Sequence, residues 1–437
     1  MLLTEKRLQK FALWSLFIFT FSGVVSLISV KLDNPVLRIW KEAIIIGILL
    51  LSVFSALLRK NIALTKLASL FLLLVPAFLL YFLFSINTNT LLVAYQIKND
   101  VVPLLFAFSL YIILSDQEDT GEFYKKMIKL VVVTATINSF FIYIESMFPS
   151  AFMATLQIEE FNNSGGKSGI RLDNALGSLR AMGTMTTFIN AGTLTFFGIV
   201  CVLESGFYTR LKKWVLFAIM VSALILTTYK TAMIALVIYL VTKVVYTFFK
   251  RLRGSKMIYL FSAVVTFLFM GFVFNTFTVY DALAGTKYKP FAYNSIYLRS
   301  LQHSDVIKDM ENRDSFYTGL GVGTNGTMGP NEKLKLKSKA LDSTYIYLMS
   351  NYGFLGALLY VSVLLMLLLY FCSQSSKFDN IAIIFLFYTL GADFFINNTF
   401  SNFPCNVILY SFIIVSLLHT RRAKRSDNPV RDDPMRV

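Results

Sequence analysis

Long apolar runs alternate with short polar breaks along most of the chain. A helix of about 20 apolar residues crosses a bilayer, and most of these runs have about that length. The pattern therefore predicts an all-α, polytopic integral membrane protein with about twelve transmembrane helices. A membrane β-barrel would instead show short segments of alternating polarity. The predicted helices cover 11–30, 42–58, 67–86, 100–115, 128–148, 183–203, 214–229, 231–249, 257–278, 343–371, 380–396 and 402–419.

Two polar segments interrupt this pattern and define the predicted organisation. Residues 1–278 contain the first nine helices, with a smaller outer loop near 149–182. A large loop of mixed charge, 279–342, separates them from the last three helices in 343–419, and 420–437 form a basic tail. A charge at bilayer depth costs roughly 2.5–3.5 kcal/mol. The large loop is therefore where we expect the chemistry.

The composition agrees with a membrane protein. Of 437 residues, 56% are hydrophobic and 15% are charged, and the mean hydropathy is +0.63. Soluble domains carry about 25% charged residues. The net charge of +16 would suggest nucleic acid in a soluble protein, but we expect no nucleic-acid partner, because most of the excess follows from basic cytoplasmic loops. Cys201, Cys372 and Cys405 have no metal-site or redox spacing.

The basic residues also predict the orientation. Cytoplasmic loops carry an excess of Lys and Arg, and a cytoplasmic N-terminus places every strongly basic short segment inside. Both termini are then cytoplasmic, and the two polar segments face outwards. The inner basic residues are Arg59, Lys60, Lys66, Lys125, Lys126, Arg210, Lys212, Lys213, Lys250, Arg251, Arg253, Lys256, Lys377 and the Arg421-Arg422-Ala423-Lys424-Arg425 run.

Three cations are expected at the outer face outside the large loop. Arg171 and Arg180 precede a predicted helix, and guanidinium groups bind phosphate in bidentate fashion. The alternative is that they are ordinary membrane-edge arginines. Lys230 follows a short polar break and lies away from the cytoplasm. It is either a lysine that snorkels to the interface or a third cation facing the same outer cavity.

The large loop carries further candidates. His303 follows Arg299 by four residues. His303 is either a surface histidine without a role or a group that titrates near neutrality. Asp342, at the end of the loop, is expected as the N-cap of the next helix, as a general base at the mouth of a membrane cavity, or as both. Glu145 and Asp393 lie near the outer ends of apolar runs, where ionisable groups are functional candidates, unless they sit at the water boundary.

Glycines and lysines mark the rest of the loop. Gly319, Gly321 and Gly323 allow the backbone to approach closely a ligand or another chain segment. An alternating basic run is either a solvated face or an attraction for anionic glycan or lipid phosphate. It consists of Lys333, Lys335, Lys337 and Lys339.

The order of these motifs resembles the O-antigen polymerase and ligase superfamily of bacterial surface-polysaccharide assembly. Arg299 precedes Gly319-Leu320-Gly321-Val322-Gly323, and after an insert comes Asp342-Ser343-Thr344-Tyr345-Ile346-Tyr347. Tyr352-Gly353-Phe354-Leu355-Gly356 follows, and Arg180-Ala181-Met182-Gly183-Thr184 lies upstream. About twelve spans and one dominant periplasmic loop are also similar to that family.

The chain departs from the family's pattern at two positions. Ligases of the superfamily place a histidine after the glycine turn, where this chain has Asp342, and this favours a polymerase. The family often has an arginine where this chain has Lys230. Lysine keeps the charge but loses bidentate geometry.

The resemblance implies a glycosyltransferase of the cell inner membrane with its active site facing the periplasm. Its donor would be a growing glycan on undecaprenyl diphosphate, and its acceptor the terminal sugar of a lipid-linked repeat unit. Asp342, or alternatively His303, would accept the proton of the attacking hydroxyl. No cofactor is expected, and no metal, because no carboxylate pair has Mg²⁺ spacing. The expected diphosphate-binding residues are Arg171, Arg180, Lys230 and Arg299.

Further expectations concern partners and rivals. The bilayer, a chain-length regulator and a flippase are the implied partners. One alternative function is an O-antigen ligase, which shares the chemistry but uses another acceptor. A second is a flippase or transporter of the lipid-linked oligosaccharide, which would carry its polar groups near the bilayer midplane.

Overall fold

The described residues form helices joined by turns and loops, together with one pair of two-residue antiparallel strands, β1 (Asn174–Ala175) and β2 (Ser178–Leu179). This computed structural model describes residues 5–32, 39–58, 90–115, 120–156, 174–175, 178–252, 254–280, 293–326, 341–374 and 379–427. The all-α prediction therefore holds for the bundle, and the small strand pair lies within the smaller predicted loop.

Helices form at the predicted segments, except that 67–86 lies outside the described residues. Within the described ranges, six helical segments are long and apolar enough to cross a membrane, or seven if a pair bent by 69° at residues 20–21 is one span. The six are Trp40–Leu58, Leu92–Leu114, Thr120–Met147, Lys230–Phe249, Met257–Phe274 and Thr344–Ser373. The bent pair is α1 (Glu5–Phe19) and α2 (Ser22–Lys31).

Several boundaries differ from those predicted. The helix expected at 100–115 is preceded by another, and the one expected at 380–396 changes to a π-helical turn, η3 (Tyr388–Asp393). The last helix runs on to Asp427, into the predicted tail.

In the first half the helices are α3 (Trp40–Leu58), α5 (Thr90–Asp100), α6 (Val102–Leu114), α7 (Thr120–Met147), α8 (Pro149–Leu156) and α10 (Phe188–Glu204). In the second half they are α11 (Arg210–Leu226), α12 (Lys230–Phe249), α13 (Met257–Tyr280), α14 (Tyr293–Glu311), α15 (Thr344–Ser373), α16 (Asp379–Phe387), the 3₁₀ turn η4 (Thr399–Ser401) and α17 (Cys405–Asp427).

The outer surface of the bundle is apolar, as a lipid-facing surface requires. Large hydrophobic side chains of α12, α13 and α15 are exposed, among them Phe248, Phe272 and Leu359. Carboxylates are found inside instead, because Glu145 and Asp393 are each only 1% exposed. This inversion supports a membrane protein.

Aromatic rings form much of the interior. Phe385 of α16 stacks on Phe197 of α10 with ring centroids 3.8 Å apart, and it meets Phe412 of α17 edge to face. A second, smaller core joins α13, α14 and α15 and includes Phe274, Val306 and Ile346. The second core fixes α14, which lies within the predicted large loop, to the membrane helices.

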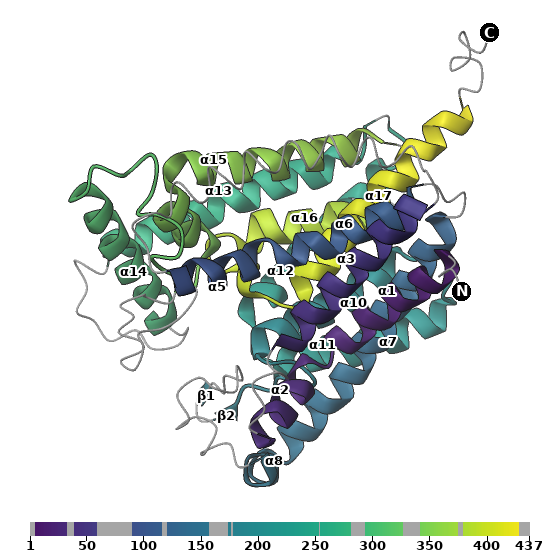
Figure 1. The fold of residues 1–437 in the computed structure, drawn as a ribbon, viewed down its shortest axis with the longest axis horizontal. Helices are drawn as coiled ribbons and strands as arrows, with labels where there is room; N and C mark the ends of the chain where they lie inside the picture. Colours follow the sequence, from purple (N-terminus) through teal and green to yellow (C-terminus); the bar gives the residue numbers. More distant parts are fainter. Residues whose placement is uncertain are drawn as a thin grey trace.

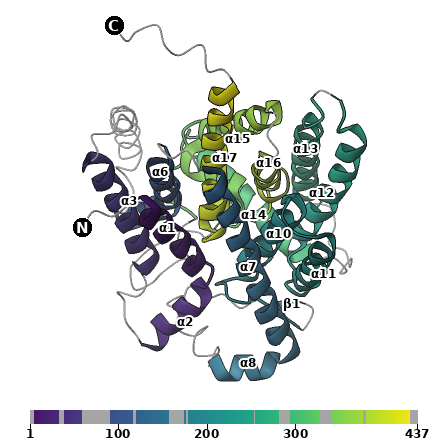
Figure 2. The ribbon, with the colours of Figure 1, turned by 90° about the vertical axis from the view of Figure 1, so that its right-hand side faces the viewer.

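The two predicted outer segments lie on the same side of the molecule. Figure 1 shows α8, the strand pair and α14 away from the beginning of α1 and the end of α17. The quarter-turn view in Figure 2 places α8 opposite the end of α17, with α12 and α13 at one flank and α3 and α6 at the other.

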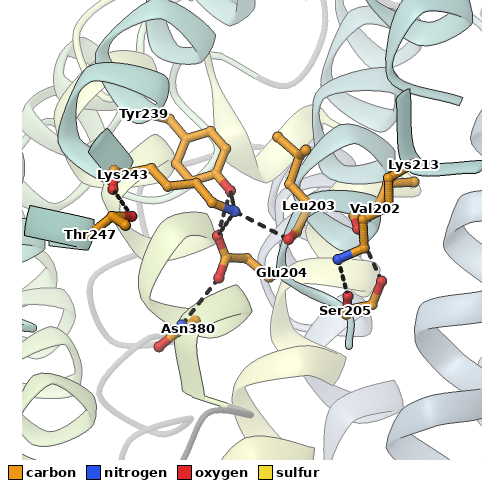
Figure 3. A network of polar contacts seen from close by, with 9 residues as sticks. All are labelled: Val202, Leu203, Glu204, Ser205, Lys213, Tyr239, Lys243, Thr247 and Asn380. Carbon is orange, nitrogen blue, oxygen red and sulfur yellow. Dashed lines mark hydrogen bonds and ion pairs between the residues drawn. The ribbon is translucent and has the colours of Figure 1, made fainter. Parts of the chain in front are cut away.

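A half-buried ion pair and its hydrogen-bond partners join three helices at the opposite end of the bundle. Figure 3 shows Glu204 of α10 between Lys243 and Tyr239 of α12 and Asn380 of α16. The Lys243 Nζ lies 2.7 Å from Glu204 Oε1, the Tyr239 hydroxyl donates to the same oxygen at 2.6 Å, and Asn380 donates to the other at 3.1 Å. Each polar atom of this carboxylate is therefore satisfied.

Gly353 is the most demanding backbone position in α15, and it supplies a test of the fold. Its φ is +69°, and a Cβ there would meet the carbonyl oxygen of Tyr317 at 2.3 Å. We expect Gly353→Ala to lose about 1–3 kcal/mol of stability through backbone strain, measured as a lower unfolding temperature in detergent. Gly47→Ala in α3 is the matched control, since nothing lies within 4 Å of its Cβ position. Equal stability of both variants would contradict this account.

Candidate functional site

The start of α15 leaves the side chain of Asp342 available for chemistry. The predicted N-cap role of Asp342 is wrong, because the helix begins at Thr344 and the Ser343 hydroxyl accepts from the Ile346 N–H at 3.5 Å. Asp342 itself is half-buried, and its backbone N–H donates to Gln302 of α14 at 3.4 Å. Its carboxylate makes no hydrogen bond or ion pair with any residue that the structure describes.

His303 of α14 follows Gln302, the residue that accepts from the Asp342 N–H. Its ring centroid is 5.5 Å from that of Phe274 and 5.5 Å from that of Tyr345. Burial lowers the pKa of His303 from its ordinary value of 6.5, so the imidazole is neutral at pH 7. Arg299 precedes His303 by one helical turn and is half-buried. Arg299 and His303 therefore lie on the helix that Asp342 contacts through Gln302.

The segment that follows η3 packs against the start of α15, close to Asp342 in the chain. Thr344 donates from its backbone and side chain to the carbonyl of Asn397, at 3.0 and 2.7 Å. Its hydroxyl also accepts from the Thr399 N–H at 2.9 Å. The Thr399 hydroxyl in turn donates to the buried carboxylate of Asp393 at 3.3 Å. The start of α15 is thus fixed by hydrogen bonds to 393–399.

The same carboxylate holds the start of α12. The Tyr229 hydroxyl donates to Asp393 Oδ1 at 2.8 Å, and Asn397 donates to the Tyr229 hydroxyl at 3.3 Å. Tyr388 also donates to Asp393, at 3.3 Å. Tyr229 is the N-cap residue of α12, so Lys230 is the first residue of that helix, and it is exposed.

Arg180 belongs to the same end of the bundle. Its guanidinium lies over the ring of Phe188 at 4.5 Å, and Phe188 meets Tyr229 edge to face at 6.0 Å. The Arg180 Nε is buried without a hydrogen-bond partner among the described residues. Arg180 therefore lies near Tyr229, the residue before Lys230, which bonds to Asp393 and Asn397, while Thr344, two residues after Asp342, bonds to Asn397 and Thr399.

Buried side chains of α7 hold the turn after Arg180. Glu145 accepts from the backbone N–H groups of Met182 and Gly183 at 2.7 and 3.0 Å. Asn138 accepts from the N–H of Thr184 at 2.8 Å. Both α7 residues accept from backbone donors, which fixes the chain between the strand pair and α10.

The glycine run packs against the chain itself. Gly319 has φ of +81° and its Cβ position would meet the backbone of Asn351 and Gly353 at 2.6–2.8 Å. Gly323 comes equally close to the backbone of α5, and its N–H donates to Gln96. Gly321 is buried with positive φ as well. Of the two expectations for these glycines, the close approach to another segment is what the structure shows.

The sequence analysis did not single out Asp100, a carboxylate that joins α5 to α15. Asp100 accepts from the hydroxyls of Tyr347 and Tyr352, and it is 7% exposed. The sequence feature that contains this carboxylate is the polar run Lys98-Asn99-Asp100 immediately before an apolar helix. By itself this run predicts only the boundary of a span. Arg171, by contrast, lies outside the described residues.

No family model matches the chain, and no curated protein matches it either. The chemistry of the site must therefore be argued from its own residues. The site has the half-buried carboxylate of Asp342, the neutral imidazole of His303 on the helix that Asp342 contacts, and the cations Arg299, Arg180 and Lys230 near the hydrogen-bonded segment 393–399. Such a set can hold a phosphate-bearing ligand and accept a proton from it.

The environment of His303 predicts a pH dependence of stability. Because its pKa is lowered in the folded state, the unfolded chain binds a proton as pH falls through 6.5 while the folded chain does not. This contribution is fully present above pH 6.5 and decreases below it. We expect unfolding temperatures in detergent to fall less between pH 7 and 5.5 for His303→Gln than for wild type. Parallel pH profiles would show that His303 is not buried in this way.

Proposed function

We propose that the protein is an integral-membrane glycosyltransferase that polymerises lipid-linked oligosaccharide repeat units at the outer face of the cytoplasmic membrane. The donor is a growing glycan on undecaprenyl diphosphate, and the acceptor is the terminal sugar of another lipid-linked repeat unit. The observation that carries the proposal is the contact of Asp342 with α14, the helix of Arg299 and His303, beside residues 393–399, which also bind Tyr229 at the start of α12. The resemblance to O-antigen polymerases adds the substrate class.

The proposed step is a transfer of a glycosyl group. A hydroxyl oxygen of the acceptor sugar attacks the anomeric carbon of the donor, and a new glycosidic C–O bond forms. The C–O bond between that carbon and the diphosphate breaks, and undecaprenyl diphosphate leaves with the electron pair. Asp342 takes the hydroxyl proton, with His303 as the alternative base. Arg180, Lys230 and Arg299 stabilise the negative charge that develops on the diphosphate.

The positions of the polar groups favour an enzyme over a transporter. A transporter carries its substrate site near the midplane, where broken helices meet. Here Asp342 precedes α15 and Lys230 begins α12 on one side of the bundle, and Glu204 pairs with Lys243 on the other side. An O-antigen ligase would use the same step with a different final acceptor, and the aspartate at 342 favours the polymerase.

The proposal includes a location and an orientation. Both termini are cytoplasmic in the inner membrane, and the side with α8 and α14 faces the periplasm. A flippase supplies the lipid-linked repeat on that side, and a chain-length regulator acts with the polymerase.

Asp342→Asn tests the proposed base. It keeps the size of the side chain but removes the proton acceptor, so we expect polymer formation to fall by about 10²–10⁴-fold. The measurement is the surface-glycan ladder, by gel, of a deletion strain complemented with wild type or variant. The deletion strain should show single repeats, and wild type should restore the ladder. A full ladder from Asp342→Asn would remove this residue from the mechanism, and polymer stranded on the lipid carrier would indicate a ligase.

Arg299→Ala tests the proposed charge stabilisation. Loss of one donor to the leaving group typically costs about 10²–10³-fold in rate, so long chains should disappear while the protein still inserts. Arg299→Lys should recover only part of the activity, because it retains charge without the bidentate fork. Arg313→Ala is the matched control, since Arg313 is exposed just beyond the end of α14. Equal ladders from the variants at 299 and 313 would contradict the role of Arg299.

A further inference from the structure

A second pocket with charged side chains lies at the same side of the bundle, and the site described above does not use it. It is formed by the start of α3, the junction between α5 and α6, and the chain from η4 into α17. Lys41, Glu42, Lys98 and Asn99 line it from the first two elements, and Phe403 lines it from the third.

The positive and negative side chains of this pocket do not cancel. Lys98 Nζ lies 2.9 Å from Glu42 Oε1, so these two neutralise each other. Lys41 has no such partner among the described residues, and its ammonium lies over the ring of Phe403, 4.5 Å from the centroid. The pocket therefore keeps one positive charge, which suits an anionic ligand.

The pocket also has an acceptor in need of a donor. The second carboxylate oxygen of Glu42 is buried and has no hydrogen-bond partner within the described ranges. A buried acceptor left in this state costs about 1–3 kcal/mol, and a sugar hydroxyl would satisfy it. A cation for phosphate, an acceptor for hydroxyls and the ring of Phe403 together fit a phosphorylated sugar better than a simple anion.

The pocket adjoins the candidate site through the chain at 398–401. Phe400 and Ser401 line the pocket, and the ring of Phe400 lies 5.4 Å from that of Tyr347 in α15. On the other side, Asn398 donates to the carbonyl of Leu341, the residue before Asp342, at 3.5 Å. One short segment therefore separates this pocket from the proposed base.

We propose that this pocket binds the diphosphate and first sugar of a second polyprenyl-linked molecule, the acceptor of the reaction proposed above. Lys41 contacts the diphosphate, and Glu42 accepts from a sugar hydroxyl. The inference rests on the proposed function, because a polymerase must hold two lipid-linked molecules at once. The cations Arg180, Lys230 and Arg299 then serve the donor, and Lys41 serves the acceptor.

The test is equilibrium binding of radiolabelled undecaprenyl diphosphate to the full chain in nanodiscs. Wild type should bind two molecules. Lys41→Gln should bind one of them about ten-fold more weakly, as expected for one lost charge-assisted hydrogen bond. Arg299→Gln should weaken the other. Lys41→Arg should keep both, and Lys126→Gln, an exposed position of α7, is the control for charge. Matching unfolding temperatures exclude misfolding as the cause.

The outcomes separate this inference from the proposed function. One bound molecule that is lost in Arg299→Gln and unchanged in Lys41→Gln would overturn the pocket and leave the polymerase intact. No binding at all to wild type would overturn both. Unlabelled competitors identify the source of the phosphate. Equal displacement from the Lys41 site by inorganic pyrophosphate or by phosphatidylglycerol would show a soluble anion or a bulk lipid headgroup and overturn the acceptor assignment.

Discussion

A buried carboxylate at the end of η3 holds together the part of the molecule where the proposed chemistry takes place. Asp393 is 1% exposed, and within an apolar bundle such a group must be surrounded by donors. Hydroxyls of Tyr229, Tyr388 and Thr399 provide them. These donors come from α12, from η3 itself and from the segment after it. Satisfying one carboxylate thus fixes the start of α12 and, through Thr399, the start of α15.

The distribution of polar groups follows from the same constraint. In hydrocarbon each unsatisfied polar group costs several kcal/mol, and Glu204, Glu145 and Asp100 each accept hydrogen bonds near one of the two ends of the bundle. At one end the Glu204–Lys243 pair closes a network over three helices. At the other, Glu145 and Asp100 hold backbone and tyrosine donors. Stacked aromatic rings between them connect α10, α16 and α17, which makes the bundle a rigid support for the site.

Local hydrogen bonding and packing decide which side chains at that end are engaged within the protein and which stay available to a ligand. Ser343 caps α15, so the carboxylate of Asp342 is not needed for the helix. The glycines of the large loop allow it to pack closely against α5 and α15, so they position the loop and do not line a ligand site. The chain at 398–401 separates Asp342 from the pocket of Lys41. The proposed donor and acceptor sites lie on either side of one short segment, which is the arrangement that the proposed transfer between two lipid-linked glycans needs.

The sequence alone determined the helical class and the membrane-protein character, and it named Asp342, Arg299 and His303 as candidates, because apolar run length and charge placement are local properties that lipid selects directly. Only the tertiary structure decided that Ser343 is the cap, that the glycines pack on the chain, and that Asp100 and Asp393 are buried acceptors. It also brought Lys41 beside Phe403, although the two are far apart in the sequence. Such contacts depend on which helix ends meet, and no periodicity within one helix records that.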